Sequence, residues 1–302
     1  MGNKIIKLIF FGNYFVGLLA VALTFECILQ LNLPQLSLSY YFLLFLAPIV
    51  YYTFAYHKAS LDPHAVNPRN KWYFQHKRLI GISQMVLTLL SVVLAGNIIY
   101  QDYERILRLP ADYWLSIVVI SAAAIFYYGL LPKSFVKLDL RVRGWLKPFV
   151  IGFVWACCAN VLPLIIVKIE SGVDFSDSWF WAFLFVKNWM FCTVNAIIFD
   201  IKDYPTDANQ HLRTFVVRYG LRKTIFNILM PLIFVGVFSM LIFAYIESFS
   251  AVHIFLSILP FGLTIYLAYS MHRRQKIMYY LMIIDGLILV KALCGIIGMQ
   301  FY

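Results

Sequence analysis

The sequence predicts an all-α protein integral to a membrane, folded as a bundle of nine transmembrane helices. Of its 302 residues, 62% are apolar and only 13% are charged, whereas a soluble domain carries about 25% charged residues. The apolar residues form continuous runs of about 20, which is the length that an α-helix needs to cross the hydrocarbon core. The runs do not alternate with polar residues as the strands of a membrane barrel would. Lysine and arginine gather in alternate connections between the runs, as membrane topology requires.

The first predicted helix lies near the N-terminus, where a signal peptide would also lie. This segment is long and lacks a small-residue cleavage site, so we expect it to remain as the first span. Tyrosine and tryptophan residues gather near the ends of the predicted helices, as an interfacial aromatic belt does. The four segments are 9–31, 38–56, 79–100 and 112–131.

The remaining five predicted helices are equally apolar, and some contain proline, which membrane helices tolerate. All five cysteines of the chain fall within predicted helices and form no C-x-x-C pair. We therefore interpret them as small apolar residues of the core and not as disulfides or metal ligands. The five segments are 146–167, 178–199, 225–247, 250–270 and 279–301.

The positive charges predict how the chain is oriented. Twenty of the 25 lysines and arginines lie in the N-terminal segment and the even-numbered connections, and only Arg105, Arg108 and Lys168 lie in the odd-numbered ones. The positive-inside rule then places the N-terminus in the cytoplasm and the C-terminus outside a cell membrane that the chain crosses repeatedly. Topology and anionic lipid head groups explain the net charge of +11. We expect no nucleic-acid partner.

Two cytoplasmic connections are long and polar, at about 57–78 and 200–224. We interpret the chain as a single transmembrane domain, 1–302, capped by these two loops. They are four spans apart, which hints at two related halves of four helices, although the two halves share little sequence. The first loop holds three histidines without cysteine partners, so we expect no zinc site.

The second loop begins with three carboxylates, Asp200, Asp203 and Asp207, in the spacing D-x-x-D-x-x-x-D. Offsets of three, four and seven bring them to one face of a helix, where like charges repel. In an ordinary soluble protein such a triplet is most often a solvated helix end. At the end of a membrane span, hard oxygen ligands at this density suit Mg²⁺ bridging to a phosphate.

Nine spans with this motif closing the sixth resemble the UbiA family of intramembrane prenyltransferases. The segment 200–220 is similar to that family's second aspartate-rich motif over about 21 residues, including the downstream pair Arg213-Thr214 and the closing Gly220. The resemblance implies two aspartate motifs that face each other across a cavity mouth and bind Mg²⁺ with an isoprenyl diphosphate. It also implies transfer of the isoprenyl group to a lipophilic or aromatic acceptor in the membrane.

The first aspartate motif of that family, N-D-x-x-D-x-x-x-D, is degenerate in this chain. Alignment on Asn70-Lys71 puts Phe54, Ala55, Lys58 and Asp62 at its four defining positions. Only one carboxylate remains, and a lysine stands at a metal-ligand position. A lysine there could contact the diphosphate directly, as an ammonium that replaces one magnesium.

The resemblance assigns roles to nine residues. Asp203 and Asp207 are the predicted catalytic residues. The predicted metal ligands are Asp200, Asp203, Asp207 and Asp62. The predicted diphosphate-binding residues are Lys58, Arg69, Lys71, Lys202 and Arg213.

Two other functions fit the sequence. The degenerate first motif fits a non-catalytic, UbiA-like protein that binds lipids. Ionisable residues inside spans are functional candidates by default, and an ion-coupled transporter would use Glu26, Lys187 and Asp285 as a relay. A fourth such residue is Lys291. The structural alternative for these residues is a buried ion pair, either Glu26–Lys187 or Asp285–Lys187.

Overall fold

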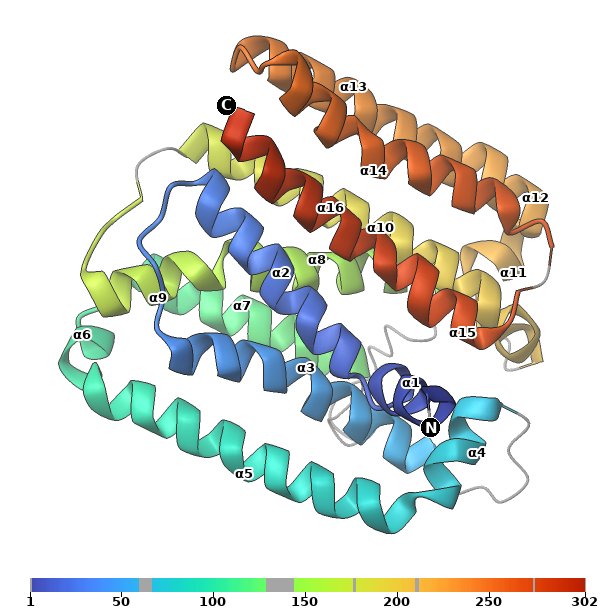
Figure 1. Cartoon of the computed structure of the whole chain (residues 1–302), viewed down its shortest axis with the longest axis horizontal. Helices are drawn as coiled ribbons and strands as arrows, with labels where there is room; N and C mark the ends of the chain where they lie inside the picture. Colours follow the sequence, from blue (N-terminus) through green and yellow to red (C-terminus); the bar gives the residue numbers. More distant parts are fainter. Residues whose placement is uncertain are drawn as a thin grey trace.

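The computed structural model describes residues 2–59, 67–128, 144–175, 178–209, 212–273 and 275–301. Within these ranges the chain forms helices, turns and loops without a strand. The long helices lie side by side in one bundle (Figure 1). The first half contains α1 (Gly2–Phe11), α2 (Tyr14–Gln30), α3 (Leu38–Ala59), α4 (Pro68–Gln75), α5 (Lys77–Gln101), α6 (Tyr103–Leu107) and α7 (Ala111–Tyr128).

The second half of the bundle includes two π-helical turns, which continue into the helices that follow them. Its elements are α8 (Lys147–Asn160), α9 (Leu162–Ser171), α10 (Ser178–Asn209), α11 (Phe215–Tyr219), α12 (Leu221–Lys223), η1 (Thr224–Leu229), α13 (Met230–Ile246), α14 (Ala251–Ser270), α15 (Ile277–Tyr279), η2 (Tyr280–Ile284), α16 (Asp285–Gly298) and η3 (Met299–Phe301).

Among the residues that the structure describes, six helices are long and apolar enough to cross a membrane, and a seventh candidate is the bent pair α1–α2. Two of the nine predicted segments correspond to shorter apolar helices, at Leu38–Phe54 and Ala111–Ile125. The membrane class and the all-α fold are therefore supported. The described part of the chain gives six or seven candidate spans by length and composition, so the nine predicted spans are not confirmed. Helix α5 fits lipid contact because almost none of it is buried, whereas a helix of a soluble protein buries an apolar stripe.

The predicted continuous helix over 9–31 is wrong at its start. The structure breaks it after Phe11, and α1 and α2 meet at a bend of 57°. Asn13 adopts a left-handed conformation at the break, with φ of 66°. Asparagine tolerates this conformation better than most residues with a side chain, and its amide donates to Thr53 Oγ1 at 3.0 Å.

The centre of the bundle consists of α2, α8, α10 and α16. Helix α10 packs along α8, and α16 packs against both α2 and α14 (Figure 1). Gly152 allows α8 to approach α10 closely, because a Cβ there would lie 2.8 Å from the Trp189 carbonyl oxygen. This packing places the end of α10, which carries the aspartate motif, beside the start of α8.

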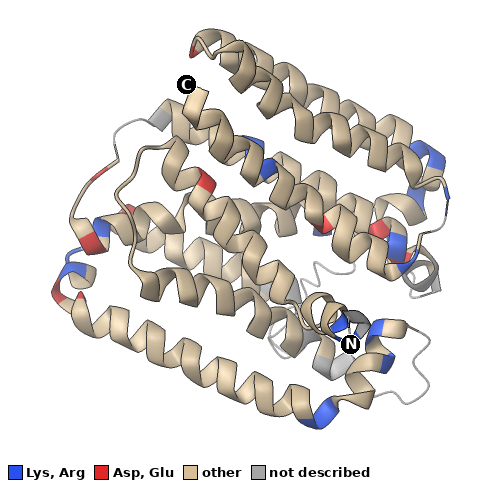
Figure 2. Cartoon of the chain, in the orientation of Figure 1, with Lys and Arg blue, Asp and Glu red and all other residues tan. Residues whose placement is uncertain are grey.

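Basic residues mark one end of the bundle. Figure 2 shows lysines and arginines gathered near α4, α12 and α15, at the right of the view. The ends of α3 and α10 lead to the same side of the molecule (Figure 1). The ends of α3 and α10, from which the two polar connections begin, therefore lie toward the same end of the bundle.

Candidate functional site

Arg69 anchors the basic end of the bundle from the start of α4. This short helix begins where the Asn67 side chain accepts a hydrogen bond from the Arg69 backbone N–H at 2.9 Å. The Arg69 side chain is buried and donates to the Phe11 carbonyl oxygen, with Nη2 at 3.0 Å, and to Asn13 Oδ1 at 2.5 Å. The hydroxyl of Tyr73 donates to the same carbonyl at 2.9 Å. These hydrogen bonds connect the α1–α2 bend to α4.

Tyr56 connects this anchor to the aspartate motif. Its ring lies beneath the Arg69 guanidinium, which is 3.8 Å from the ring centre. The Tyr56 hydroxyl also interacts electrostatically with Lys202, Asp203 and Lys147. The end of α3 is therefore within electrostatic range of the end of α10, although more than 130 residues separate Tyr56 from Lys202 in the sequence.

Asp200, the first aspartate of the motif, is buried and is already paired with a lysine of the same chain. Lys147 Nζ lies 2.7 Å from Asp200 Oδ1, while Asp200 Oδ2 is buried without a hydrogen-bond partner. One turn along α10, Asp203 is partly exposed and pairs with Lys202 at 3.3 Å. The sequence identifies Lys147 only as one of the positive charges that set the membrane orientation, because no neighbouring residue relates it to a motif 53 residues away.

The other predicted phosphate contacts differ in exposure. Lys71 and Arg213 are both exposed. Thr214 is buried and caps α11, because its hydroxyl accepts from Val217 N at 3.4 Å. The segment at Arg213 packs against Gly144, where a Cβ would lie 2.5 Å from Thr214 N. This packing brings the downstream basic-threonine pair to the residues that lead into α8.

Three predicted residues lie outside what the structure describes, namely Asp62 and the side chains of Lys58 and Asp207. Among the described side chains, no group of three or more His, Cys, Asp or Glu residues is arranged to hold a metal ion. Two of the predicted ligands, Asp200 and Asp203, are described, and each is paired with a lysine. The four-carboxylate metal site remains a prediction.

A shallow pocket borders the Arg69 anchor between α1, α3, α4 and α5. Its enclosed space is only ≈ 40 Å³. Apolar side chains such as Leu8 and Ile49 line it, together with Thr53 and Tyr73, which belong to the hydrogen-bonded surroundings of Asn13 and Arg69. This space is much smaller than a small-molecule site usually is.

The ionisable residues inside the spans separate into two groups. Asp285 interacts electrostatically with Arg69 and Lys202, so it belongs to the basic end. The alternative Asp285–Lys187 pair is therefore wrong, since the charged groups that interact with Lys187 are Glu26 and Lys291. The predicted Glu26–Lys187 contact is present at 4.0 Å.

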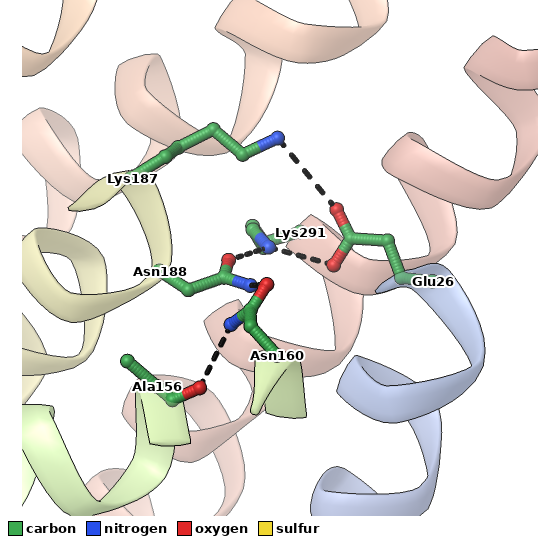
Figure 3. Close-up of polar contacts among 6 residues, drawn as sticks. All are labelled: Glu26, Ala156, Asn160, Lys187, Asn188 and Lys291. Atoms are coloured by element: carbon green, nitrogen blue, oxygen red, sulfur yellow. Dashed lines mark hydrogen bonds and ion pairs between the residues drawn. The ribbon is translucent and has the colours of Figure 1, made fainter. Parts of the chain in front are cut away.

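Glu26, Lys187 and Lys291 form a buried charge cluster at the centre of the bundle (Figure 3). The closest partner of Glu26 is Lys291, whose Nζ lies 2.6 Å from Oε2. Lys291 also donates to Asn188 Oδ1, and Asn188 donates to Asn160 Oδ1 at 3.1 Å. Sequence reasoning missed the Glu26–Lys291 pair because 265 residues separate the partners.

Comparisons with protein-family models, with curated proteins and with solved structures gave no match for this chain.

Proposed function

We propose that the chain is an intramembrane prenyltransferase that binds an isoprenyl diphosphate at the basic end of the bundle. The observation that carries this proposal is the arrangement of the basic end, where Tyr56 lies beneath Arg69 and within electrostatic range of Lys202 and Asp203. Arginine and lysine are the residues that bind phosphate groups most strongly. The nine-span arrangement and the UbiA-like fold belong to the same proposal.

The acidic motif fits Mg²⁺ in part. Asp200 Oδ2 is a buried oxygen without a hydrogen-bond partner, and Asp203 follows one turn later on the same helix. Carboxylate oxygens of this kind are preferred ligands of Mg²⁺. When bound, the ion supplies positive charge that stabilises the departing diphosphate. The ligands would be Asp200, Asp203 and Asp207, with Asp62 from the first loop.

The chain's own residues supply the remaining requirements of the reaction. Lys202, Lys71 and Arg213 would bind the diphosphate, which leaves with the electron pair of the broken carbon–oxygen bond. The apolar helices around the basic end would exclude water from the resulting allylic cation. The acceptor would then form the new carbon bond to this cation and release a proton. Arg69 would fix the position of Tyr56 and α4 around the donor.

A second candidate is a non-catalytic protein that binds an isoprenyl lipid. The pairs Lys147–Asp200 and Lys202–Asp203 favour it, because they neutralise carboxylates that a catalytic metal site would use. At the degenerate first motif, Phe54 is exposed where the family motif has asparagine. The two candidates share ligand binding and differ in whether the carbon–oxygen bond breaks.

Binding and turnover of a labelled donor would separate these functions. Purified protein in lipid nanodiscs is titrated with farnesyl or geranylgeranyl diphosphate, with and without Mg²⁺, and diphosphate release is measured with lipophilic aromatic acceptors. Asp203→Ala is the site variant, and Asp112→Ala, which removes an exposed carboxylate at the start of α7, is its matched control. Binding that needs Mg²⁺ and Asp203, followed by release, supports the transferase. Binding without release supports the second candidate, and absence of binding overturns both.

A further inference from the structure

Helix α1 turns away from the axis of α2 at the basic end of the bundle. The two helices meet at a bend of 57°, and the bend is fixed where the Arg69 side chain donates to the Phe11 carbonyl oxygen at 3.0 Å. The 17 residues of α2 extend about 26 Å at the rise of an α-helix, and the hydrocarbon core is about 30 Å thick. Helix α2 therefore crosses most of the core without α1.

The side chains of α1 divide into a basic face and an apolar face. Lys4 and Lys7 are three residues apart, and Ile5 and Ile9 are four residues apart, so each pair shares one side of the helix. All four side chains are exposed, as is Ile6. The isoleucines favour contact with acyl chains, whereas lysines are costly within the hydrocarbon core. Both preferences are met where the head groups border the acyl chains.

Two further cations lie beside α1, at the start of α5. Lys77 and Arg78 are exposed there, and the two helices are neighbours because Leu8 of α1 and Leu79 of α5 line the same small pocket. Figure 1 shows α1 and α4 together at this end of the bundle, and Figure 2 shows the basic residues gathered around them. We refer to the four exposed cations of α1 and α5 as the α1 surface, namely Lys4, Lys7, Lys77 and Arg78.

The α1 surface has no negative charge of its own to balance it. Helices α1, α4 and α5 contain no aspartate or glutamate. Within the described part of the chain, none of the four cations forms an ion pair. A membrane leaflet that carries anionic lipids attracts basic residues at this depth. The surface therefore complements such a leaflet in charge, and the isoleucines of α1 complement it in polarity.

We propose that α1 lies in the head-group layer of the membrane and that the α1 surface binds the phosphates of anionic phospholipids. The ammonium and guanidinium groups donate charge-assisted hydrogen bonds to the phosphate oxygens, while Ile5, Ile6 and Ile9 contact the first part of the acyl chains. A zwitterionic head group carries its own cation, so the surface selects lipids of net negative charge. None of the four cations is a predicted diphosphate ligand, so the proposal is independent of prenyl transfer.

The first test measures the depth of α1 in the membrane. The exposed residues Ile5 and Leu89, the latter in the middle of α5, are replaced singly as Ile5→Cys and Leu89→Cys and labelled with a fluorophore in nanodiscs. The wild type is the labelling blank. Quenching is compared between lipids with a nitroxide near the head group and lipids with a nitroxide near the acyl-chain end. We expect the shallow nitroxide to quench position 5 more strongly and the deep one to quench position 89 more strongly. Stronger deep quenching at position 5 would overturn the proposal.

The second test measures which lipid gathers at α1. Shallow nitroxides on phosphatidylglycerol and on phosphatidylcholine are compared as quenchers of position 5. We expect phosphatidylglycerol to be enriched about threefold or more at low salt, and less at high salt. Equal quenching by the two lipids would overturn the proposal.

Charge variants assign this enrichment to the lysines of α1. Lys4→Gln/Lys7→Gln should remove at least about half of it, and both side chains are exposed, so the fold should be retained. The matched control is Arg108→Gln/Lys168→Gln, which removes two cations at the end of α6 and in α9, at the other end of the bundle (Figure 1), where each has an acidic partner. The control should keep the wild-type enrichment. Full enrichment in Lys4→Gln/Lys7→Gln, or an equal loss in the control, would overturn the proposal.

Discussion

Lys147 Nζ lies 2.7 Å from Asp200 Oδ1, so the acidic motif of α10 receives a cation from the start of α8. Asp200 is buried, and its other oxygen has no hydrogen-bond partner. The pair therefore stabilises the contact between two central helices and also lowers the negative charge that any metal ion would meet.

Loss of Lys147 should destabilise the protein more than loss of the whole pair. Lys147→Met leaves a buried carboxylate without its counter-ion, and we expect a cost of about 2–4 kcal/mol in the free energy of unfolding. The double variant Lys147→Met/Asp200→Asn should recover part of this cost because no charge is left unpaired. Thermal unfolding in detergent measures both. Equal stability of the single and double variants would contradict the buried pair.

Arg69 and Lys71 should respond differently, although the sequence assigns both to the diphosphate. Arg69→Lys removes the forked contacts to Phe11 and Asn13, so we expect a loss of about 2–3 kcal/mol in stability. Lys71→Met removes an exposed side chain, so its effect on stability should stay within about 0.5 kcal/mol. Its effect on diphosphate affinity should be a clear reduction. Unfolding curves and donor titrations of the two variants give the contrast.

Removal of Mg²⁺ should weaken donor binding through the aspartates of α10. We expect EDTA to reduce the affinity of the wild type for farnesyl diphosphate by about tenfold or more. In Asp203→Asn the same treatment should have little effect, because a proposed metal ligand is already lost. Titrations with and without EDTA test this difference. A wild-type affinity that is indifferent to EDTA would leave Arg and Lys as the sole phosphate ligands.

Close packing of α8 on α10 should depend on Gly152. A Cβ there would lie 2.3 Å from Thr193 Oγ1 and 2.8 Å from two backbone atoms, so Gly152→Ala must separate the helices. We expect a loss of about 1–3 kcal/mol in stability. Gly96→Ala on α5 is the control, because its Cβ would meet nothing within 4 Å, and it should be neutral or slightly stabilising. Comparison of their melting temperatures tests the close approach.

The sequence predicts the helical segments well because a continuous apolar run indicates a segment that is buried in protein or in lipid. It misses the break after Phe11, since the residues on both sides are apolar and the left-handed conformation of Asn13 is held by distant partners. Thr53, Arg69 and Tyr73 lie 40 to 60 residues away along the chain. A local pattern contains no information about such contacts.

In the candidate site, too, the sequence predicts some features from local spacing and misses those that depend on distant contacts. The spacing of Asp200 and Asp203 identifies one side of the basic end, because a helix converts spacing into a shared face. Tyr56 and Lys147 complete that end through tertiary packing, and no spacing rule relates them to the motif. Ionisable residues in spans are recognisable as needing partners, but which partner each one finds depends on how the helices assemble.

The Glu26–Lys291 pair joins the first long helix of the bundle to the last. During synthesis at about 5–20 residues per second, Glu26 enters the membrane on the order of 10–50 s before its closest counter-ion is made. Lys187, 4.0 Å from Glu26 in the folded protein, is made before Lys291. Of the two lysines that face Glu26, it is therefore the one available during this interval.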